Sequence, residues 1–412
     1  MAEKKQVTVI GGGSSGMMAA ISAARCGCEV LLLERKDRVG KKLLATGNGR
    51  CNLTNADCAL SRFHGGDPAF IASVLSRFPA ASAIDFFEEL GIACKTEDEG
   101  KIFPNSEQAS AVLDVLRYEL ERLRVDVRTG YEVRRILPRD REFALPLSAG
   151  GELKAGRVIL AAGGMAGPQF GSDGSGFRLA RELGHRVIEP LAAIVALRLK
   201  ADFLRKLKGV KFIGQAEVHS DGEVLRREPG EILFTDNGLS GPPILQLSRT
   251  AAAALQKKAD VRIVLDLFPG STPEELGAAL TQRFTRQGAK TVAFGLVGLL
   301  NKRLIPLLLA QAGIVDPAVA CSGLPAQART RLARLLKNWS FTVAGTQPWP
   351  QAQVTAGGIA LGEVHPSTLE SRLVPGLYFC GEVLDVDGDC GGFNLQWAWS
   401  SGYVAGNSAA GC

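Results

Sequence analysis

The sequence lacks the patterns that metal sites and membrane spans require. Its nine cysteines include no CxxC pair, and its four histidines, among them His64, have no regular partner spacing. Zinc is usually held by cysteine and histidine at short, fixed spacings, so we expect no metal site and interpret the histidines as structural. The most apolar long stretch, residues 291–315, is interrupted by polar residues at 301–303 and by Pro306, so it is not expected to span a membrane.

The chain also lacks a strong charge and an apolar leader. It has 48 basic and 42 acidic residues, a net charge of +6 over 412 residues. This mild excess gives little reason to expect a nucleic acid or a membrane surface as partner. The first residues, MAEKKQVTVI, pass from charges directly into a strand-like segment, which does not fit a signal peptide. We therefore expect a cytoplasmic protein whose cysteines are reduced thiols; its oligomeric state stays open.

Glycine, by contrast, is abundant, with 48 residues. Such a content predicts many tight turns or places where backbone comes close to a ligand. At roughly 150 residues per domain, the length predicts two or three domains.

Residues 7–34, VTVIGGGSSGMMAAISAARCGCEVLLLE, form the clearest local signal. They predict a strand, an alanine-rich helix and a second strand, with the GxGxxG spacing of Gly11, Gly13 and Gly16 in the first turn. The first glycine permits the turn, the second lets backbone approach a pyrophosphate, and the third lets the helix pack on the strand. Glu34 ends the second strand, where a carboxylate binds ribose hydroxyls. We interpret the unit as a dinucleotide site; the alternative is a turn with a surface glutamate.

Two later segments favour a longer ligand than a nicotinamide dinucleotide. RVILAAGG, residues 157–164, predicts a buried strand that ends in a glycine pair. GEVLDVDGDCGGFNLQWAWSSG, residues 381–402, follows another strand and predicts a second helix from Phe393. A helix N-terminus stabilises the negative charge of a reduced flavin ring. The three segments together predict FAD; an acidic terminal loop with a packing helix is the alternative.

The middle of the chain follows a different pattern. Residues 191–267 contain alternating segments such as VKFIGQAEV, which predict an antiparallel sheet or small barrel. Residues 272–337 predict helix throughout, starting at Thr272-Pro273. Strands are predicted again at Phe341 and at residues 353–361. We interpret the middle as an insertion between two halves of a nucleotide-binding domain.

Four stretches carry a family resemblance. GKKLLATGNGRCNLTN, LFTDNGLSGPPILQLS, VTAGGI and GEVLDVDGDCGGFNLQWAWSSG resemble the BaiN/YhiN-like family of flavoproteins, also described as aminoacetone-oxidase-like. The resemblance spans essentially the whole chain. It implies an α/β fold: a Rossmann-type FAD-binding domain at 1–190 and 345–412, an inserted antiparallel β-barrel substrate domain at 191–268 and 338–344, and a small helical domain at 269–337.

The fingerprint, the two later segments and the resemblance predict one set of cofactor-binding residues. They are Gly11, Gly13, Ser15, Gly16, Glu34, Arg35, Lys42, Gly49, Arg50, Asn52, Val133, Ala162, Gly163, Gly164, Gly381, Glu382, Asp385, Gly392, Phe393, Asn394 and Leu395.

Several other residues receive narrower interpretations. Lys41 is expected either to neutralise the pyrophosphate or to lie in a solvated basic turn. Cys51 and Cys390 are interpreted as small buried residues, because no CxxC pair marks a redox disulfide. Asp236 is expected to cap the turn in LFTDNGLSGPP; an acid–base role is the alternative. No catalytic residue is predicted.

The resemblance implies the activity more closely than the residues do. Family members have been assigned to reduction of 3-oxo-4,6-dienoyl bile acids and, in another branch, to amine oxidation. Gly167, Phe170, Ser175 and the pair Asp236-Asn237 depart from the usual family pattern at loops expected to face ligand, which concerns the substrate more than the cofactor.

We expect an FAD-dependent oxidoreductase that uses NAD(P)H to reduce a C=C bond in an unsaturated 3-oxo, steroid-like or related small substrate. No second glycine fingerprint opens another β-α-β unit, so the donor is expected to bind transiently at the flavin face. The alternatives are a flavin oxidase acting on a small amine with oxygen, an RNA-modifying flavoprotein and a non-catalytic flavin-binding protein. An RNA enzyme should carry a basic stripe, which residues 329–334 offer only faintly.

Overall fold

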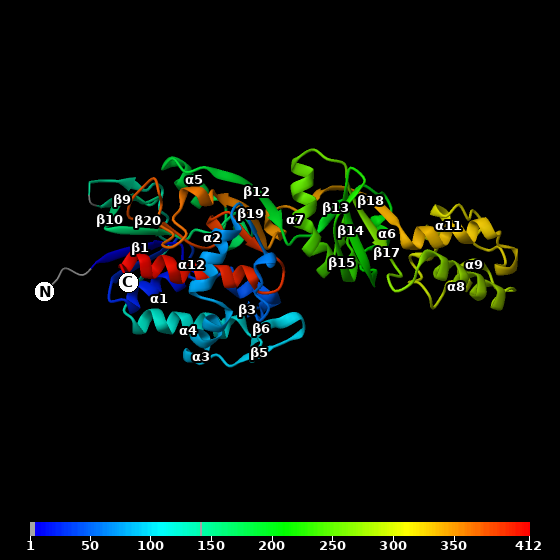
Figure 1. Ribbon diagram of the computed structural model, residues 1–412, viewed down its shortest axis with the longest axis horizontal. Coiled ribbons are helices and arrows are strands. Elements are labelled where there is room, and N and C mark those ends of the chain that lie inside the picture. The colour runs from blue at the N-terminus through cyan, green and yellow to red at the C-terminus, as the bar shows by residue number, and fades with distance from the viewer. Residues whose placement is uncertain (1–4, 141) are drawn as a thin grey trace. The chain divides into compact units, whose positions relative to one another are not determined.

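The computed structural model describes residues 5–140 and 142–412, and its contacts divide the chain into two units (Figure 1). The first unit takes in residues up to Ala192 together with Trp349–Cys412, and the second is Ala193–Pro348. The expected fold class is confirmed: the first unit has a parallel Rossmann-type sheet, and the second contains a closed barrel and several helices. The three-part domain division stays a prediction, since barrel and helices share one hydrophobic cluster.

A five-stranded parallel sheet forms the centre of the first unit, in the order β20-β11-β1-β2-β7. β1 lies in the middle, where Val7 pairs with Val30 on one side and Arg157 on the other. The inner strands are continuous apolar runs, as a sheet covered on both faces requires. The strands are β1 (Gln6–Ile10), β2 (Glu29–Glu34), β7 (Asp126–Thr129), β11 (Arg157–Leu160) and β20 (Leu377–Phe379).

Two helices far apart in sequence pack closely beside this sheet. α1 (Ser14–Arg25) and α12 (Phe393–Ala410) lie side by side (Figure 1). A Cβ atom at Gly402 would lie 2.5 Å from the Ser15 carbonyl oxygen, and one at Gly406 would lie 2.4 Å from that of Ala19. These glycines therefore let the last helix approach the first nucleotide-binding helix at backbone distance.

The remaining elements of the first unit surround the sheet. Its helices are α2 (Pro68–Arg77), α3 (Ala80–Glu89), α4 (Ala109–Arg122) and α5 (Ser175–Glu182). Its shorter strands are β3 (Thr54–Asn55), β4 (Phe63–Gly65), β5 (Cys94–Thr96), β6 (Lys101–Pro104), β8 (Leu137–Pro138), β9 (Phe143–Pro146), β10 (Glu152–Ala155), β12 (Val187–Ala193), β19 (Val354–Ile359) and β21 (Val386–Gly388). Between β7 and β8, Val133 makes an isolated bridge to Leu147.

One described stretch, Pro68–Glu89, is long and apolar enough to cross a membrane by length and composition. It consists of α2 and α3, which are separated at Phe78-Pro79. A residue that precedes proline disfavours helical backbone, so the stretch breaks into two helices there.

The second unit is a closed six-stranded barrel followed by helices. The barrel order is β13-β16-β15-β14-β17-β18. The strands are β13 (Leu197–Leu199), β14 (Lys211–Ser220), β15 (Glu223–Phe234), β16 (Gly238–Ser240), β17 (Val261–Asp266) and β18 (Trp339–Thr346), and the helices are α6 (Leu204–Leu207), α7 (Pro242–Gln256), α8 (Pro273–Arg286), α9 (Val292–Gly295), α10 (Ile305–Gln311) and α11 (Ala326–Lys337).

Two predictions for this unit need correction. Residues 272–337 are not helical throughout: turns at Gly298 and Gly313, both with left-handed backbone, separate short helices. Asp236 was expected to cap the turn that follows it, but among the described residues no hydrogen bond from that turn to its carboxylate is found. Instead the Asp236 carboxylate forms an exposed ion pair with Lys208 at 2.8 Å.

Candidate functional site

The glycine turn after β1 is closed on one side and open on the other. A Cβ atom at Gly11 would lie 2.4 Å from the Ala161 carbonyl oxygen, and one at Gly16 would lie 1.9 Å from the Gly11 carbonyl oxygen. A Cβ atom at Gly13, in contrast, would meet no described atom within 4 Å. The outer glycines are therefore required by packing, whereas the space beside Gly13 can take a ligand. The N-cap of α1 also lacks a side-chain hydrogen bond, which leaves its N–H groups for an anion.

The C-terminal segment comes directly against this turn. A Cβ atom at Gly381 would lie 2.3 Å from Ser15 Oγ, so only glycine fits at this contact. The Gly381 N–H donates to Ser401 Oγ at 2.9 Å, and Trp397 Nε1 donates to the Gly381 carbonyl at 3.1 Å. Two predicted parts of the site, 366 positions apart, are thus brought together by α12.

Glu34 lies at the end of β2 and holds the same turn. Its carboxylate accepts hydrogen bonds from the Gly12 and Lys36 N–H groups, both at 2.8 Å. The next residue, Arg35, donates to Asp173 at 2.7 Å and to the Gly171 carbonyl at 2.5 Å. Both side chains therefore order the loops around the turn, and Glu34 keeps further lone pairs that can accept from ribose hydroxyls.

A network around Glu382 joins three predicted segments. Lys42 Nζ donates to Glu382 Oε2 at 2.6 Å, and the other carboxylate oxygen accepts from the Thr355 N–H at 2.7 Å. Thr355 Oγ1 in turn accepts from the N–H groups of Met165 and Ala166 at 2.8 and 2.9 Å. Thr355 was not predicted, although VTAGGI, which contains it, was among the resembling stretches.

The glycine pair after β11 fits closely around this network. A Cβ atom at Gly164 would lie 2.3 Å from Thr355 Oγ1, and one at Gly163 would lie 2.7 Å from Ser172 Oγ. Ala162, just before the pair, is half-buried beside Gly176.

The N-terminus of α12 is the second helix end at the site. Gly392 is its N-cap and has left-handed backbone (φ 102°), and a Cβ atom there would lie 2.3 Å from the Thr54 carbonyl oxygen and 2.9 Å from Asn52 Oδ1. Asn52 Oδ1 is buried and has no hydrogen-bond partner among the described residues. A buried acceptor without a partner is costly, so Asn52 Oδ1 is a candidate acceptor for a ligand N–H.

The neighbours of Gly392 have structural contacts. Phe393 is buried and packs edge-on against Phe63, with ring centroids 5.8 Å apart. The Asn394 side chain accepts from the Gly388 N–H at 2.9 Å and donates to the Gly388 carbonyl at 2.8 Å. Leu395 packs against the core. These residues hold the loop that carries the glycine pair 391–392.

Three buried aspartates, Asp385, Asp387 and Asp389, precede this helix. Asp385 Oδ2 accepts from the Gly66 N–H at 3.2 Å, and Asp387 pairs with His64 in the β21–β4 ladder. Asp389 Oδ1 lies 2.9 Å from His64 Nε2. His64 was interpreted as structural; the pairing with a buried aspartate 325 residues away has no signal in the local sequence.

Two predicted cofactor-binding residues point to other partners. Arg50 forms an ion pair with Glu97, lies 3.3 Å from Glu107, and stacks 4.1 Å from the Phe103 ring centre. Val133 is buried beneath its bridge to Leu147. In the cation-rich loop, Lys41 pairs with Asp37, and Gly49 adopts left-handed backbone (φ 87°). Of Lys41, Lys42 and Arg50, it is Lys42 that contacts the network around Glu382.

Three of the seven free cysteines, Cys51, Cys321 and Cys380, are buried, and the other four, which include Cys390, are half-buried. Burial raises the pKa of Cys51 and of Cys380 to about 12, so both are neutral thiols near pH 7. Burial also raises the pKa of Cys390. The expectation that all nine cysteines are reduced is wrong, because Cys26 and Cys412 form a disulfide with Cα atoms 6.5 Å apart. No local feature of the sequence indicates this pair, whose members lie 386 positions apart.

The parallel sheet, the open glycine turn and the second helix N-terminus define a Rossmann-type flavoprotein oxidoreductase. Residues 5–408 match the family described as HI0933-like protein Rossmann domain. The chain belongs to this family.

Two kinds of named relatives cover nearly the whole chain. A 3-dehydro-bile acid delta(4,6)-reductase from Clostridium scindens is 40% identical over 98% of this chain and 99% of its own length. Ribosomal RNA dihydrouridine synthases from Haemophilus influenzae and Escherichia coli are 30% and 31% identical, each over 98% of this chain and at least 97% of their own length.

Among solved structures, a 3-ketosteroid delta1-dehydrogenase from Sterolibacterium denitrificans shares the fold. Its TM-score is 0.50 at 14% identity, over 99% of this chain and 100% of that one. An open-conformation flavocytochrome c3 fumarate reductase has the same TM-score at 16% identity, over 100% of this chain and 78% of that one.

Proposed function

We propose that this protein is an FAD-dependent reductase that saturates a C=C bond conjugated to a carbonyl group, with a 3-oxo-4,6-diene of the bile-acid type as first candidate substrate. The observation that supports this most strongly is the 40% identity, over 98% of the chain, to the delta(4,6)-reductase. The open glycine turn and the N-terminus of α12 support the part of this proposal that concerns FAD binding.

The residues of the first unit fit FAD. The open space beside Gly13 and the N–H groups that begin α1 would hold the pyrophosphate. Glu34 would accept from a ribose hydroxyl, while the Lys42–Glu382 pair lies where the three segments meet. Asn52 Oδ1 and the first N–H groups of α12 would bind the polar edge of the flavin ring.

When bound, FAD supplies hydride transfer to an electron-poor carbon. The protein's part is to bind, orient and shield. Buried Phe393 and Phe63 lie next to the helix end, where a Cβ atom at Gly392 would lie 2.3 Å from the Thr54 carbonyl oxygen. We propose NAD(P)H as the transient electron donor and the cytoplasm as the compartment.

A second candidate function shares the same reaction class. The two ribosomal RNA dihydrouridine synthases favour uracil in RNA as the substrate. Dihydrouridine differs from uridine by saturation of a C=C bond conjugated to a carbonyl, which is the chemistry named for the bile-acid enzyme. Both candidates therefore need the same cofactor site and differ in what the rest of the protein binds.

The test is a single-turnover experiment on the FAD-loaded protein. The flavin is reduced without oxygen and mixed in parallel with a 3-oxo-4,6-diene bile acid, a uridine-rich ribosomal RNA transcript, or air-saturated buffer. We expect rapid flavin reoxidation by the dienone with formation of the saturated product. Reoxidation by the RNA alone would favour the second candidate, and rapid reoxidation by oxygen alone would contradict both.

A further inference from the structure

The net excess of positive charge lies in the second unit. Residues 193–348 contain 21 basic and 12 acidic residues, a net charge of +9. The rest of the chain has the other 27 of the 48 basic and 30 of the 42 acidic residues, a net charge of −3. The small overall value of +6 therefore hides a strong asymmetry, which is typical of proteins with a polyanionic partner.

Within the second unit, the excess of basic over acidic residues comes from two segments. Residues 200–211 and 268–337 together contain 14 basic and 4 acidic residues, whereas the remaining barrel residues are nearly neutral. Arg303 joins the two segments, because its guanidinium donates to the carbonyl oxygens of Lys206 and Lys208, the latter at 2.7 Å. We call the 14 basic residues of these two segments, 11 of which are exposed, the cationic surface.

The charges of the cationic surface are mostly not neutralised by carboxylates. Among the described residues, three of its 14 basic side chains have a carboxylate partner: Lys208, Lys211 and Lys337. Several arginines bind neutral backbone carbonyls instead, such as Arg283 to Val297 at 2.9 Å and Arg331 to Ala312 at 2.9 Å. A carbonyl oxygen orients a guanidinium group but carries no net charge. These arginines are therefore held in place and keep their full positive charge.

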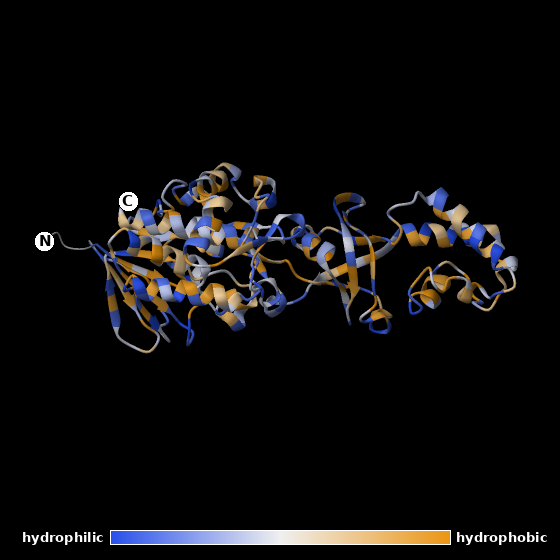
Figure 2. Ribbon diagram, turned by 90° about the horizontal axis from the view of Figure 1, so that it is seen from below, coloured by the Kyte–Doolittle hydropathy of each residue, from blue (hydrophilic) through white to orange (hydrophobic). Residues whose placement is uncertain are grey.

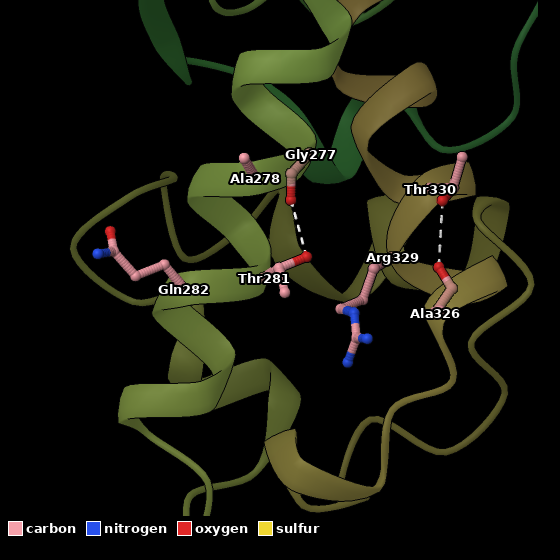
Figure 3. A pocket seen from close by; sticks show the side chains of 7 residues that line it. All are labelled: Gly277, Ala278, Thr281, Gln282, Ala326, Arg329 and Thr330. Carbon is pink, nitrogen blue, oxygen red and sulfur yellow. Dashed lines mark hydrogen bonds between the residues drawn. The ribbon is translucent and has the colours of Figure 1, made fainter.

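A groove lies within this region, between α8 and α11 (Figure 3). Its volume is about 460 Å³, and its lining consists of small or polar residues, including Thr281, Gln282, Arg329 and Thr330. Figure 3 shows the Arg329 side chain between the two helices. Hydrophilic and hydrophobic residues alternate along these helices (Figure 2), and the apolar positions of α11, such as Leu332 and Leu336, are buried.

We propose that the cationic surface binds the phosphate backbone of structured RNA. Cations without carboxylate partners suit a row of phosphates, and the lining of the groove includes hydroxyl and guanidinium groups. An anionic membrane is a weaker fit, because the groove is lined by no large apolar side chain that would enter the lipid. The proposal rests on the second candidate function for the identity of the partner, and it replaces the expectation of no nucleic-acid partner.

The test compares two triple variants of equal net charge. The first, Lys206→Glu with Lys302→Glu and Arg334→Glu, alters exposed residues of the cationic surface. The control, Arg77→Glu with Arg117→Glu and Lys257→Glu, alters exposed residues outside it. Each substitution changes the charge by −2, so both variants go from +6 to 0. Binding of the FAD-loaded proteins to a fluorescein-labelled RNA hairpin is followed by anisotropy over a range of salt concentrations.

We expect the parent and the control to bind with similar, salt-dependent affinity. The surface variant should bind at least about tenfold more weakly, with a slope of log K against log salt smaller by about 2–3, as expected for loss of three phosphate contacts. Equal weakening in both variants would overturn the proposal, as would a parent that binds only vesicles of phosphatidylcholine and phosphatidylglycerol. Binding is measured without turnover, so a failure here leaves the reductase proposal standing, and an inactive enzyme leaves this result standing.

Discussion

Lys42 Nζ lies 2.6 Å from Glu382 Oε2, although the two residues are 340 positions apart. About three quarters of each side chain is shielded from solvent. The pair ties the loop after β2 to the segment after β20, and the second Glu382 oxygen extends the link to Thr355. The two ends of the chain thus meet at one carboxylate in the candidate cofactor site.

Replacing Glu382 by glutamine should weaken FAD binding. Glutamine keeps an acceptor for the Thr355 N–H but removes the charge that Lys42 binds, so we expect a loss of about 1–3 kcal/mol in FAD affinity. Titration of the apoprotein with FAD measures this directly. Lys42→Met should produce a similar loss, and the double variant should lose less than the sum of both. Fully additive losses would show that the pair does not act as a unit.

Gly13→Val should abolish FAD binding while leaving the apoprotein folded. The backbone at Gly13 has φ −78°, which any residue adopts, and a Cβ atom there meets no described atom within 4 Å. Gly16→Ala is the contrasting variant: its Cβ would lie 1.9 Å from the Gly11 carbonyl oxygen, so it should destabilise the fold by about 1–3 kcal/mol or more. Flavin content and thermal unfolding of the apoproteins separate the two effects. Normal flavin content in Gly13→Val would rule out the phosphate site.

Glu34→Ala should reduce FAD affinity by about 1–3 kcal/mol, because charge-assisted bonds around the turn are lost. Part of this effect is expected to come from the Gly12 N–H that Glu34 holds at 2.8 Å. Glu34→Gln, which still accepts from that group, should lose less than Glu34→Ala. If both variants bind FAD as tightly as the parent, Glu34 does not contribute to FAD binding.

The sequence predicted those features that depend on short stretches. The β1–α1–β2 unit follows from the apolar run, the glycine spacing and the alanine-rich helix, all within 28 residues. The barrel and the last helix likewise follow from local periodicity.

Side-chain partners could not be predicted in this way, because they depend on which distant segments the topology brings together. Arg50 was assigned to the cofactor by its place in a motif, but Glu97 and Phe103 on neighbouring elements offer closer partners. The His64–Asp389 contact and the Cys26–Cys412 disulfide each need two strands or helices to meet first. The net charge of +6 likewise does not show that the second unit carries +9 and the rest of the chain −3.

Glu119 should make the protein sensitive to acid. Its buried carboxylate accepts hydrogen bonds from Arg122 and Arg25, which hold its pKa below the usual value. The stability this group contributes is therefore fully present above about pH 4.3 and is lost as pH falls through the lowered pKa of the folded state. Glu119→Gln should cost about 1–3 kcal/mol in free energy of unfolding near neutral pH. Urea unfolding of both proteins should show this difference shrinking below about pH 4, whereas a constant difference would exclude the ionised form as the cause.

Electron donor and substrate should compete for one face of the flavin. Within the described residues, the parallel sheet has one glycine turn of the fingerprint type, which follows β1. The glycine pairs after β11 and before α12 lie against the same candidate site. On the proposal that NAD(P)H is the donor, we expect it to share the flavin face, to bind weakly and to leave before the substrate enters. Steady-state rates at several fixed donor concentrations should give parallel double-reciprocal lines, the pattern of a ping-pong reaction. High substrate concentrations should inhibit competitively against the donor. Intersecting lines, or simultaneous binding of donor and substrate to the oxidised enzyme by equilibrium dialysis, would show that a separate nicotinamide site exists.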